Sequence, residues 1–138
     1  MYETILVPLD ATPTDRAIIE HIKKLARMLN SKVVLIHVAT GVPAQFSGSE
    51  AGGEEVNKDQ EYLRQVKAEF DAAQIPAQAL LDFGDPVKQI VKWIEQNPCD
   101  LVAMSTHGHQ FIADLILGTT ANRVQHSVSV PVLLLRAK

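Results

Sequence analysis

The sequence contains little of three things that mark specialised classes of protein: cysteine, long apolar runs and excess basic charge. Its 138 residues include one cysteine, Cys99, which excludes an intrachain disulfide and a cysteine-rich zinc site. No apolar run approaches the roughly 20 residues of a membrane span, and the N-terminus lacks the basic flank of a signal peptide. A balance of 13 basic and 16 acidic residues argues against a nucleic-acid binder. We therefore expect a cytoplasmic protein.

Three motifs of nucleotide and acyl chemistry are also missing. The sequence has no Gly-x-x-x-x-Gly-Lys-[Ser/Thr], no Gly-x-Gly-x-x-Gly after its first apolar run, and no Gly-x-Ser-x-Gly. Their absence excludes a P-loop ATPase, a dinucleotide-binding Rossmann domain and a Ser-His-Asp hydrolase. No lysine neighbours Gly118, and no positioned general base is evident. Because phosphoryl transfer normally needs both, we expect ligand binding without efficient turnover.

What the sequence does contain is a regular alternation of short apolar runs and amphipathic segments. The runs at 5–9, 33–38, 77–83, 100–105 and 130–135 are typical of strands, and the continuous ones of strands covered on both faces. Between them, apolar residues recur at helical spacing; Tyr62, Val66, Phe70 and Ala73, for example, share one stripe. The order β-α-β-α-β-α-β-α-β predicts a single α/β domain over 1–138, with helices on both faces of a mostly parallel sheet.

Several boundaries can be predicted from local signals. Thr12 is expected to cap the first helix with Asp15 as its capping-box partner, and Asp85-Pro86 to open a later helix. The last helix is expected to follow Gly118-Thr119-Thr120. The stretch 39–59 holds four of the chain's seven glycines, which predicts a long mobile loop, either a lid over a site or an idle linker.

Candidate ligand-binding residues stand at the carboxyl ends of the predicted strands, where open parallel sheets bind their ligands. Asp10 could hydrogen-bond a ribose or hold a metal, or it could be a turn residue. Gly108 follows the fourth strand, and nine residues separate it from Gly118. Gly118 and the two threonines after it would suit an anionic phosphate, because a helix start offers unpaired N–H groups. The alternative is a turn and a helix cap that bind nothing.

The histidines and the cysteine need no special chemistry. His37 lies in a predicted strand and is expected to be a hydrogen-bonded core residue. His107 and His109 lack a third ligand at metal-binding spacing, so we expect no metal site there. Cys99 has no paired thiol or flanking cation and is expected to be structural.

The whole chain resembles the universal stress protein family, from Ile5-Leu6-Val7-Pro8-Leu9-Asp10 to the last apolar run at 130–136. The resemblance includes Ile36-His37-Val38 and Gly84-Asp85-Pro86. The family's nucleotide-binding branch carries a glycine, two residues, a glycine, nine residues and then Gly-Ser or Gly-Thr. Gly108 and Gly118-Thr119 match the later parts; Ser105 replaces the first glycine, and His109 stands where a basic residue is frequent.

This resemblance implies a Rossmann-like fold with flavodoxin-like layers and a five-stranded parallel sheet of order 3-2-1-4-5. It implies ATP or AMP, with Mg²⁺ or Mn²⁺, in the crevice between the first and fourth strands. Asp10 would lie near the ribose or the metal, and the backbone of Val38 would read the adenine. The residues implied for the nucleotide site are Pro8, Leu9, Asp10, Val38, Gly84, Ser105, His107, Gly108, His109, Gly118, Thr119 and Thr120.

The resemblance also implies a homodimer joined through the last strand, Val130–Leu135, whose apolar edge needs covering.

Three functional hypotheses follow. The favoured hypothesis is a stress-response sensor that binds an adenine nucleotide and changes its shape and its regulatory protein partner. A second is a module for protein–protein interaction that binds no nucleotide, which Ser105 and the missing basic residue support. A third is a slow ATP hydrolase, in which Asp10 or His107 would act as base.

Overall fold

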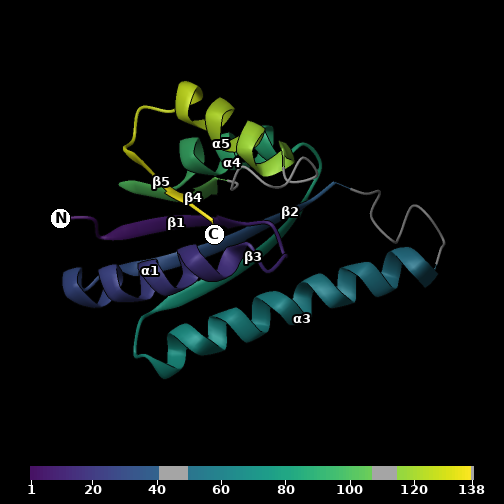
Figure 1. The fold of residues 1–138 in the computed structure, drawn as a ribbon, viewed down its shortest axis with the longest axis horizontal. Helices are drawn as coiled ribbons and strands as arrows, with labels where there is room; N and C mark the ends of the chain where they lie inside the picture. Colours follow the sequence, from purple (N-terminus) through teal and green to yellow (C-terminus); the bar gives the residue numbers. More distant parts are fainter. Residues whose placement is uncertain (41–49, 107–114, 138) are drawn as a thin grey trace.

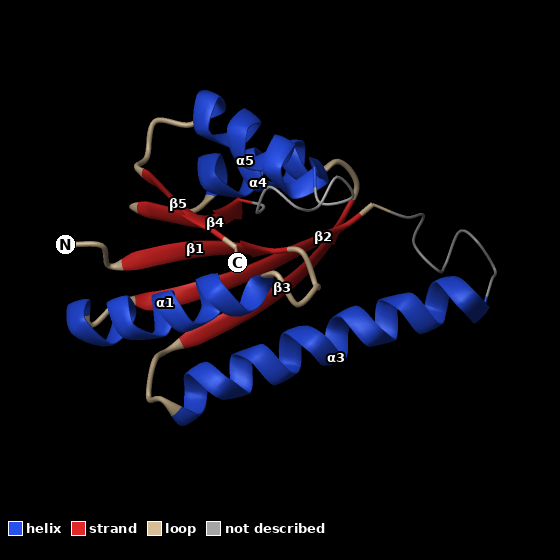
Figure 2. Cartoon of the chain, in the orientation of Figure 1, coloured by secondary structure: helices blue, strands red, loops and turns tan. Residues whose placement is uncertain are grey.

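Five parallel strands form one sheet in the order β3-β2-β1-β4-β5 (Figures 1 and 2). A computed structural model describes residues 1–40, 50–106 and 115–137. Among these residues the strands are β1 (Thr4–Leu9), β2 (Lys32–Ala39), β3 (Ala77–Phe83), β4 (Leu101–Thr106) and β5 (Val132–Arg136). The helices are α1 (Asp15–Leu29), α3 (Glu50–Ala72), α4 (Pro86–Gln96) and α5 (Leu115–Ser127). The predicted strand order and parallel direction are confirmed.

The helices cover the sheet in two layers, α1 and α3 on one face and α4 and α5 on the other (Figure 2). Successive residues of a strand point to opposite faces, so Ile5 and Val7 pack with α1 and α3 while Leu6 packs with α4 and α5. Every residue of β1 is buried. This double cover explains why the central strands are continuous apolar runs.

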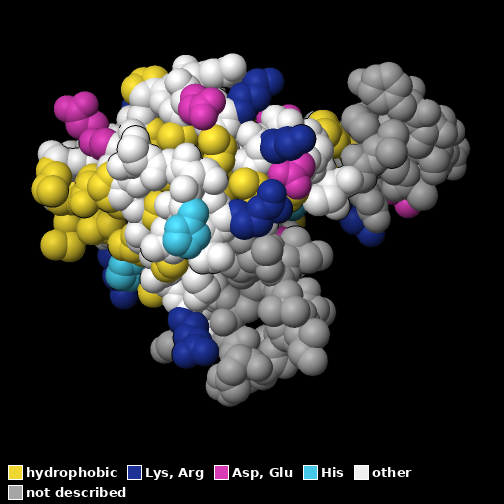
Figure 3. All heavy atoms as spheres, turned by 90° about the horizontal axis from the view of Figure 1, so that it is seen from above, with side chains coloured by type: hydrophobic (Ala, Val, Ile, Leu, Met, Phe, Trp, Pro, Cys, Tyr) yellow, Lys and Arg dark blue, Asp and Glu magenta, His cyan; other side chains and the backbone are white. Residues whose placement is uncertain are grey.

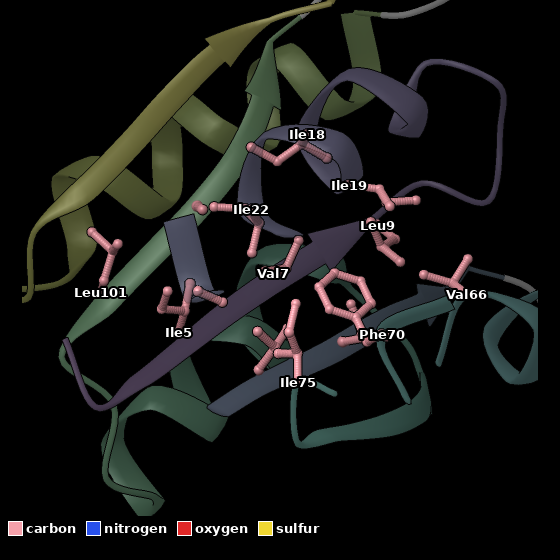
Figure 4. Close-up of a cluster of buried hydrophobic side chains, with 14 of the residues drawn as sticks. Ile5, Val7, Leu9, Ile18, Ile19, Ile22, Val66, Phe70, Ile75 and Leu101 are labelled. Carbon is pink, nitrogen blue, oxygen red and sulfur yellow. The ribbon is translucent and has the colours of Figure 1, made fainter. Parts of the chain in front are cut away.

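The core beneath α1 and α3 is built from aliphatic side chains around one aromatic ring (Figure 4). Ile18 and Ile22 of α1 and Phe70 of α3 are fully buried against β1. At the surface, Arg16 of α1 forms an ion pair with Glu69 of α3 at 2.7 Å. Apolar contacts and this ion pair hold the two helices together.

The first helix begins later than predicted. Asp15 is its first residue; Thr14 occupies the cap position without a side-chain cap, and Thr12 lies in the preceding turn. The Asp15 carboxylate does not reach Thr12 but accepts hydrogen bonds from the backbone N–H groups of Asp10 and Ala11. The capping-box prediction is therefore wrong, because the carboxylate is engaged by the end of β1.

The prediction for α4 is confirmed. Asp85 accepts a hydrogen bond from the N–H of Lys88 at 2.9 Å, and Pro86 occupies the first helical position. Proline suits this position because its missing N–H would be unpaired there in any case.

Two predictions about the other helices are wrong. α5 begins at Leu115, so Gly118-Thr119-Thr120 lie inside its first turns and do not precede it. α3 begins at Glu50, so the loop predicted over 39–59 is wrong for 50–59; residues 41–49 lie outside the described residues. Both predictions rest on glycine as a helix breaker, yet glycine costs a helix only about 1 kcal/mol relative to alanine. Helix-favouring neighbours and packing outweigh that cost.

Candidate functional site

A pocket lies at the carboxyl ends of β1 and β2, on the sheet face that α4 and α5 cover. Its walls are mostly apolar, with the carboxylate of Asp10 and the hydroxyl-bearing Thr120 as polar members. The lining residues are Pro8, Leu9, Asp10, Ile36, Val38, Pro86, Ile90 and Thr120. β1 pairs with β2 on one side and β4 on the other, so chain connections leave it in opposite directions. Such a switch point is where open parallel sheets bind ligands.

Five residues predicted for the site meet in this pocket: Pro8, Leu9, Asp10, Val38 and Thr120. Three lining residues, Ile36, Pro86 and Ile90, were missed. The period of two along β2 places Ile36 on the same face as Val38 and could have found it. The helix-opening signal at Asp85-Pro86 could have indicated the α4 wall in the same way.

Two other predicted residues lie outside the pocket lining. Gly84 directly follows β3 with a φ of +123°, a conformation that favours glycine, and its N–H donates to the Ala39 carbonyl. Ser105 shares the sheet face of Leu101 and Ala103, which pack beneath α1 and α3. Its side chain therefore points away from the pocket, and only its backbone is placed to meet a ligand there.

The remaining predicted residues can be placed only in part. His107, Gly108 and His109 lie outside the described residues. The backbone of Gly118 and Thr119 belongs to α5, and the side chain of Thr119 is not among those described.

The backbone of Val38 faces the end of β1. Lys32 donates to the Glu3 carbonyl on the β1 side, whereas Val33 donates to Pro76 on the β3 side. This alternation directs the N–H and C=O of every second residue of β2, Val38 included, toward β1. The register pairs Leu9 with His37, so the position opposite Val38 is Asp10, one residue beyond β1.

The segment after β1 has an unusual backbone held by one carboxylate. Ala11 has a φ of +62°, which is strained for a residue with a Cβ. Its N–H donates to Asp15 Oδ2 at 2.9 Å, and the N–H of Asp10 donates to Oδ1 of the same carboxylate at 2.9 Å. Asp15 is fully buried, and the Tyr62 hydroxyl donates to it at 2.6 Å. Burial, and the charge of Asp15 next to it, raise the pKa of Tyr62 well above its usual value.

His37 is the hydrogen-bonded core histidine that the sequence predicted. It is 8% exposed, and its Nδ1 lies 2.9 Å from the Leu9 carbonyl oxygen. A carbonyl oxygen only accepts hydrogen bonds, so Nδ1 carries a proton. Nε2 lies 3.5 Å from Asp59 Oδ2 on α3, and the two form an ion pair when the imidazole is protonated.

Other features of the described residues bear on alternative functions, namely metal binding, membrane insertion, nucleic-acid binding and thiol chemistry. No group of three or more His, Cys, Asp or Glu side chains among them could hold a metal ion. No described helix is long and apolar enough to cross a membrane. On the face seen in Figure 3, the described Lys and Arg side chains are interspersed with Asp and Glu and form no continuous basic patch. Burial raises the pKa of the Cys99 thiol, which disfavours the reactive thiolate.

A larger hollow of about 260 Å³ lies at the opposite end of the sheet. Lys32, Gln78, Trp93 and Asn97 are among its lining residues, and it contains none of the predicted site residues. Because it opens at the amino ends of β1, β2 and β3, it lacks the switch-point geometry of the smaller pocket.

Comparison with known proteins identifies the family. A sequence model described as the Universal stress protein family matches residues 1–136. The chain belongs to the universal stress protein family. It is 26% identical to Universal stress protein MJ0577 of Methanocaldococcus jannaschii, over all of this chain and 97% of that protein. The solved structure of MJ0577 superposes with a TM-score of 0.78 and covers 100% of this chain and 98% of its own.

Two more distant members share the fold. A universal stress protein solved in complex with cAMP has a TM-score of 0.72 at 18% identity, covering 99% of this chain and 98% of its own. One from Archaeoglobus fulgidus, solved in complex with dAMP, has a TM-score of 0.71 at 15% identity, covering 96% and 97%. The flavodoxin-like architecture implied by the sequence resemblance is thus confirmed.

Proposed function

We propose that this universal stress protein binds an adenine nucleotide at the carboxyl ends of β1 and β4 and acts as a homodimeric sensor in a stress response. The observation that carries the proposal is the pocket at the switch point of the sheet, with apolar walls and the Asp10 carboxylate. Two members of the family with the same fold were solved with cAMP and dAMP, both adenine nucleotides.

The pocket residues suit the base and the sugar. Val38 and Ile90 offer apolar surfaces for a purine ring, and the backbone carbonyl of Val38 offers an acceptor for its edge. Asp10 can accept hydrogen bonds from ribose hydroxyls. The Asp10 carboxylate already receives the Thr12 hydroxyl at 3.5 Å, a long contact that a ribose could replace.

The phosphates are assigned to the glycine motif. Gly108, His109, Gly118, Thr119 and Thr120 would hold them, with the N-terminal end of α5 contributing its dipole. Of these residues, the structure brings Thr120 into the pocket beside Asp10. His109, which replaces a basic residue, would favour phosphate binding more in mild acid than at neutral pH.

A divalent ion would arrive with the phosphates. Asp10 supplies a carboxylate, which suits Mg²⁺ or Mn²⁺, and both ions commonly keep several waters and bind through substrate phosphates. We assign Asp10 as the protein's contribution to that coordination. The ion would neutralise phosphate charge near the carboxylate.

The pocket must widen to receive a base. Its volume is about 20 Å³, room for about one water molecule. Nucleotide binding therefore separates α4 from the end of β1, and a ligand that selects this wider state shifts the protein's conformation. This change of shape is what would allow the protein to act as a sensor, with an unidentified regulatory protein as the recipient.

The edge strand β5 is assigned to the dimer interface. Leu134 is 40% exposed, and Val132, Leu133 and Leu135 are partly exposed. An uncovered apolar edge strand is a surface for pairing with another strand. Leu134→Lys is expected to convert the dimer to a monomer in sedimentation analysis; an unchanged mass would remove β5 from the interface.

Calorimetric titration with ATP and AMP, with and without Mg²⁺, tests the nucleotide assignment. Asp10→Asn keeps the shape but removes the charge, and it is expected to weaken binding about tenfold, because hydrogen bonds to charged groups contribute about 1.5–3 kcal/mol. Asp82→Asn is the matched control: Asp82 is near the carboxyl end of β3 and does not line the pocket. No heat and no co-purified nucleotide would refute the proposal in favour of an interaction module that binds no nucleotide.

A further inference from the structure

Tyr62 of α3 is connected to the end of β1 through the buried Asp15. The Tyr62 hydroxyl donates to Asp15 Oδ2 at 2.6 Å, and the same carboxylate receives the N–H groups of Asp10 and Ala11. Because the pKa of Tyr62 is raised, its hydroxyl remains a donor throughout the physiological range. The carboxylate thus orients two consecutive amides while being fixed by α3.

Asp59 of α3 is connected through His37 to Leu9, the residue before Asp10. The imidazole donates from Nδ1 to the Leu9 carbonyl at 2.9 Å, and when Nε2 is protonated as well it forms an ion pair with Asp59 Oδ2, 3.5 Å away. Asp59 and Tyr62 are three residues apart and therefore lie on the same face of α3. The two contacts converge on three consecutive residues, 9–11.

We propose that α3 positions the ligand-binding segment 9–11 through these two side-chain relays, so that Tyr62 and Asp59 are positioning residues for the nucleotide site. The inference rests on the proposed function for its ligand, whereas the relays themselves consist of contacts in the structure. Leu9 and Asp10 line the pocket, so their backbone conformation decides how the pocket meets the base and the ribose.

The first relay, from Tyr62 through Asp15 to the N–H groups of Asp10 and Ala11, also determines what the Val38 carbonyl can bind. In the parallel ladder each residue of β2 that faces β1 accepts from the residue after its partner. For Val38, opposite Asp10, that donor would be the N–H of Ala11, which donates to Asp15 instead. The carboxylate therefore competes with the sheet for this N–H and leaves the Val38 carbonyl available to a ligand.

Backbone strain makes this arrangement sensitive to the relay. Ala11 has a positive φ of 62°, and such conformations cost about 1–3 kcal/mol. The hydrogen bonds to Asp15 compensate for the strain. If Tyr62 no longer fixes the carboxylate, Ala11 can relax toward the ladder and occupy the Val38 carbonyl that the nucleotide needs.

The experiment combines amide hydrogen exchange with nucleotide titration on the full chain. Tyr62→Phe removes a single hydroxyl, and it is expected to raise exchange at the Asp10 and Ala11 amides and to weaken ATP and AMP binding, each by about five- to tenfold. Asp59→Asn tests the second relay and is expected to change the same readouts less, because its contact is longer.

The matched control is Glu69→Gln. Glu69 also joins α3 to α1, through Arg16, but its side chain forms hydrogen bonds and ion pairs with Arg16 and Lys23 and with neither Tyr62 nor Asp59. It is expected to lower stability while leaving the exchange rates at Asp10 and Ala11 and the nucleotide affinity within twofold of the wild type. Exchange unchanged in Tyr62→Phe, or an equal loss of affinity in Glu69→Gln, would overturn the relay proposal.

Hydrogen exchange separates this proposal from the proposed function. If the wild type binds neither ATP nor AMP, the function fails, yet faster exchange at Asp10 and Ala11 in Tyr62→Phe alone would still establish that α3 positions the segment. Nucleotide binding by the wild type with unchanged exchange in the variant would refute the relay and leave the function intact.

Discussion

Two buried serines provide a direct test of what an unpaired hydroxyl costs this fold. Ser105 and Ser31 are 0% and 1% exposed. The Ser31 hydroxyl donates to the Tyr2 carbonyl, whereas Ser105 Oγ has no hydrogen-bond partner among the residues that the structure describes. The same substitution, serine to alanine, should therefore have opposite effects at the two positions.

The magnitudes follow from the cost of desolvation. Burying an unpaired hydroxyl costs about 1–3 kcal/mol, so Ser105→Ala, after the lost van der Waals contacts of the oxygen, should stabilise the fold by about 1 kcal/mol. Ser31→Ala removes a hydrogen bond and should destabilise it by about 1 kcal/mol. Urea unfolding of both variants at pH 7 measures the difference, with the slope of free energy against urea expected to stay unchanged.

The sign of the change in unfolding free energy in Ser105→Ala shows whether the Ser105 hydroxyl is unpaired. A loss of stability in Ser105→Ala as large as that in Ser31→Ala would show that the Ser105 hydroxyl is hydrogen-bonded in solution. Ser105→Ala should also leave nucleotide affinity unchanged, because the side chain lies on the sheet face opposite the pocket. A drop in affinity would show that residue 105 meets the ligand through its side chain.

Three further predictions concern stability. Hydrogen bonds from Arg16 hold the pKa of Glu69 at about 2, below 4.5, so their contribution is present above pH 4.5 and lost as the pH falls toward 2. For this partly exposed group, Glu69→Gln should cost about 1 kcal/mol at pH 7 and progressively less between pH 4.5 and 2 in urea titrations. Phe70→Ala should cost about 4 kcal/mol by the same assay, since Phe70 is fully buried. Gly84→Ala should lower the free energy of unfolding by about 2 kcal/mol, because φ is +123° and a Cβ would lie 3.3 Å from Gln89 Nε2.

Most of the fold was predictable from local signals in the sequence. The apolar runs located all five strands to within two residues, and most firmly β1, β2 and β4, because strands buried on both faces leave little freedom in composition. Asp85-Pro86 located the start of α4, because a cap and a proline act through contacts within one turn. The strand order came from the family resemblance, since periodicity carries no information on which strands pair.

The errors arose where long-range contacts outweigh local preference. Asp15 has the sequence signature of a capping residue, but its carboxylate is used by Asp10, Ala11 and the distant Tyr62. Tyr62 was correctly placed on the inner stripe of its helix, yet nothing in a stripe identifies a partner 47 residues away. The relay through α3 could not be predicted for this reason.

Several buried polar side chains lie at the carboxyl end of the sheet, whereas Thr4 and Ser31 are buried at the amino ends of β1 and β2. Asp15 and His37 are buried near the carboxyl end of β1, Ser105 lies near that of β4, and Thr120 lines the pocket there. A core selected for stability alone would favour apolar residues at such positions, because a buried polar group at best recovers its desolvation cost. Asp15, His37 and Thr120, buried at the end of the sheet that holds the pocket, are therefore what we expect if ligand binding as well as packing determines these residues. Ser105, whose side chain faces away from the pocket, is not explained in this way.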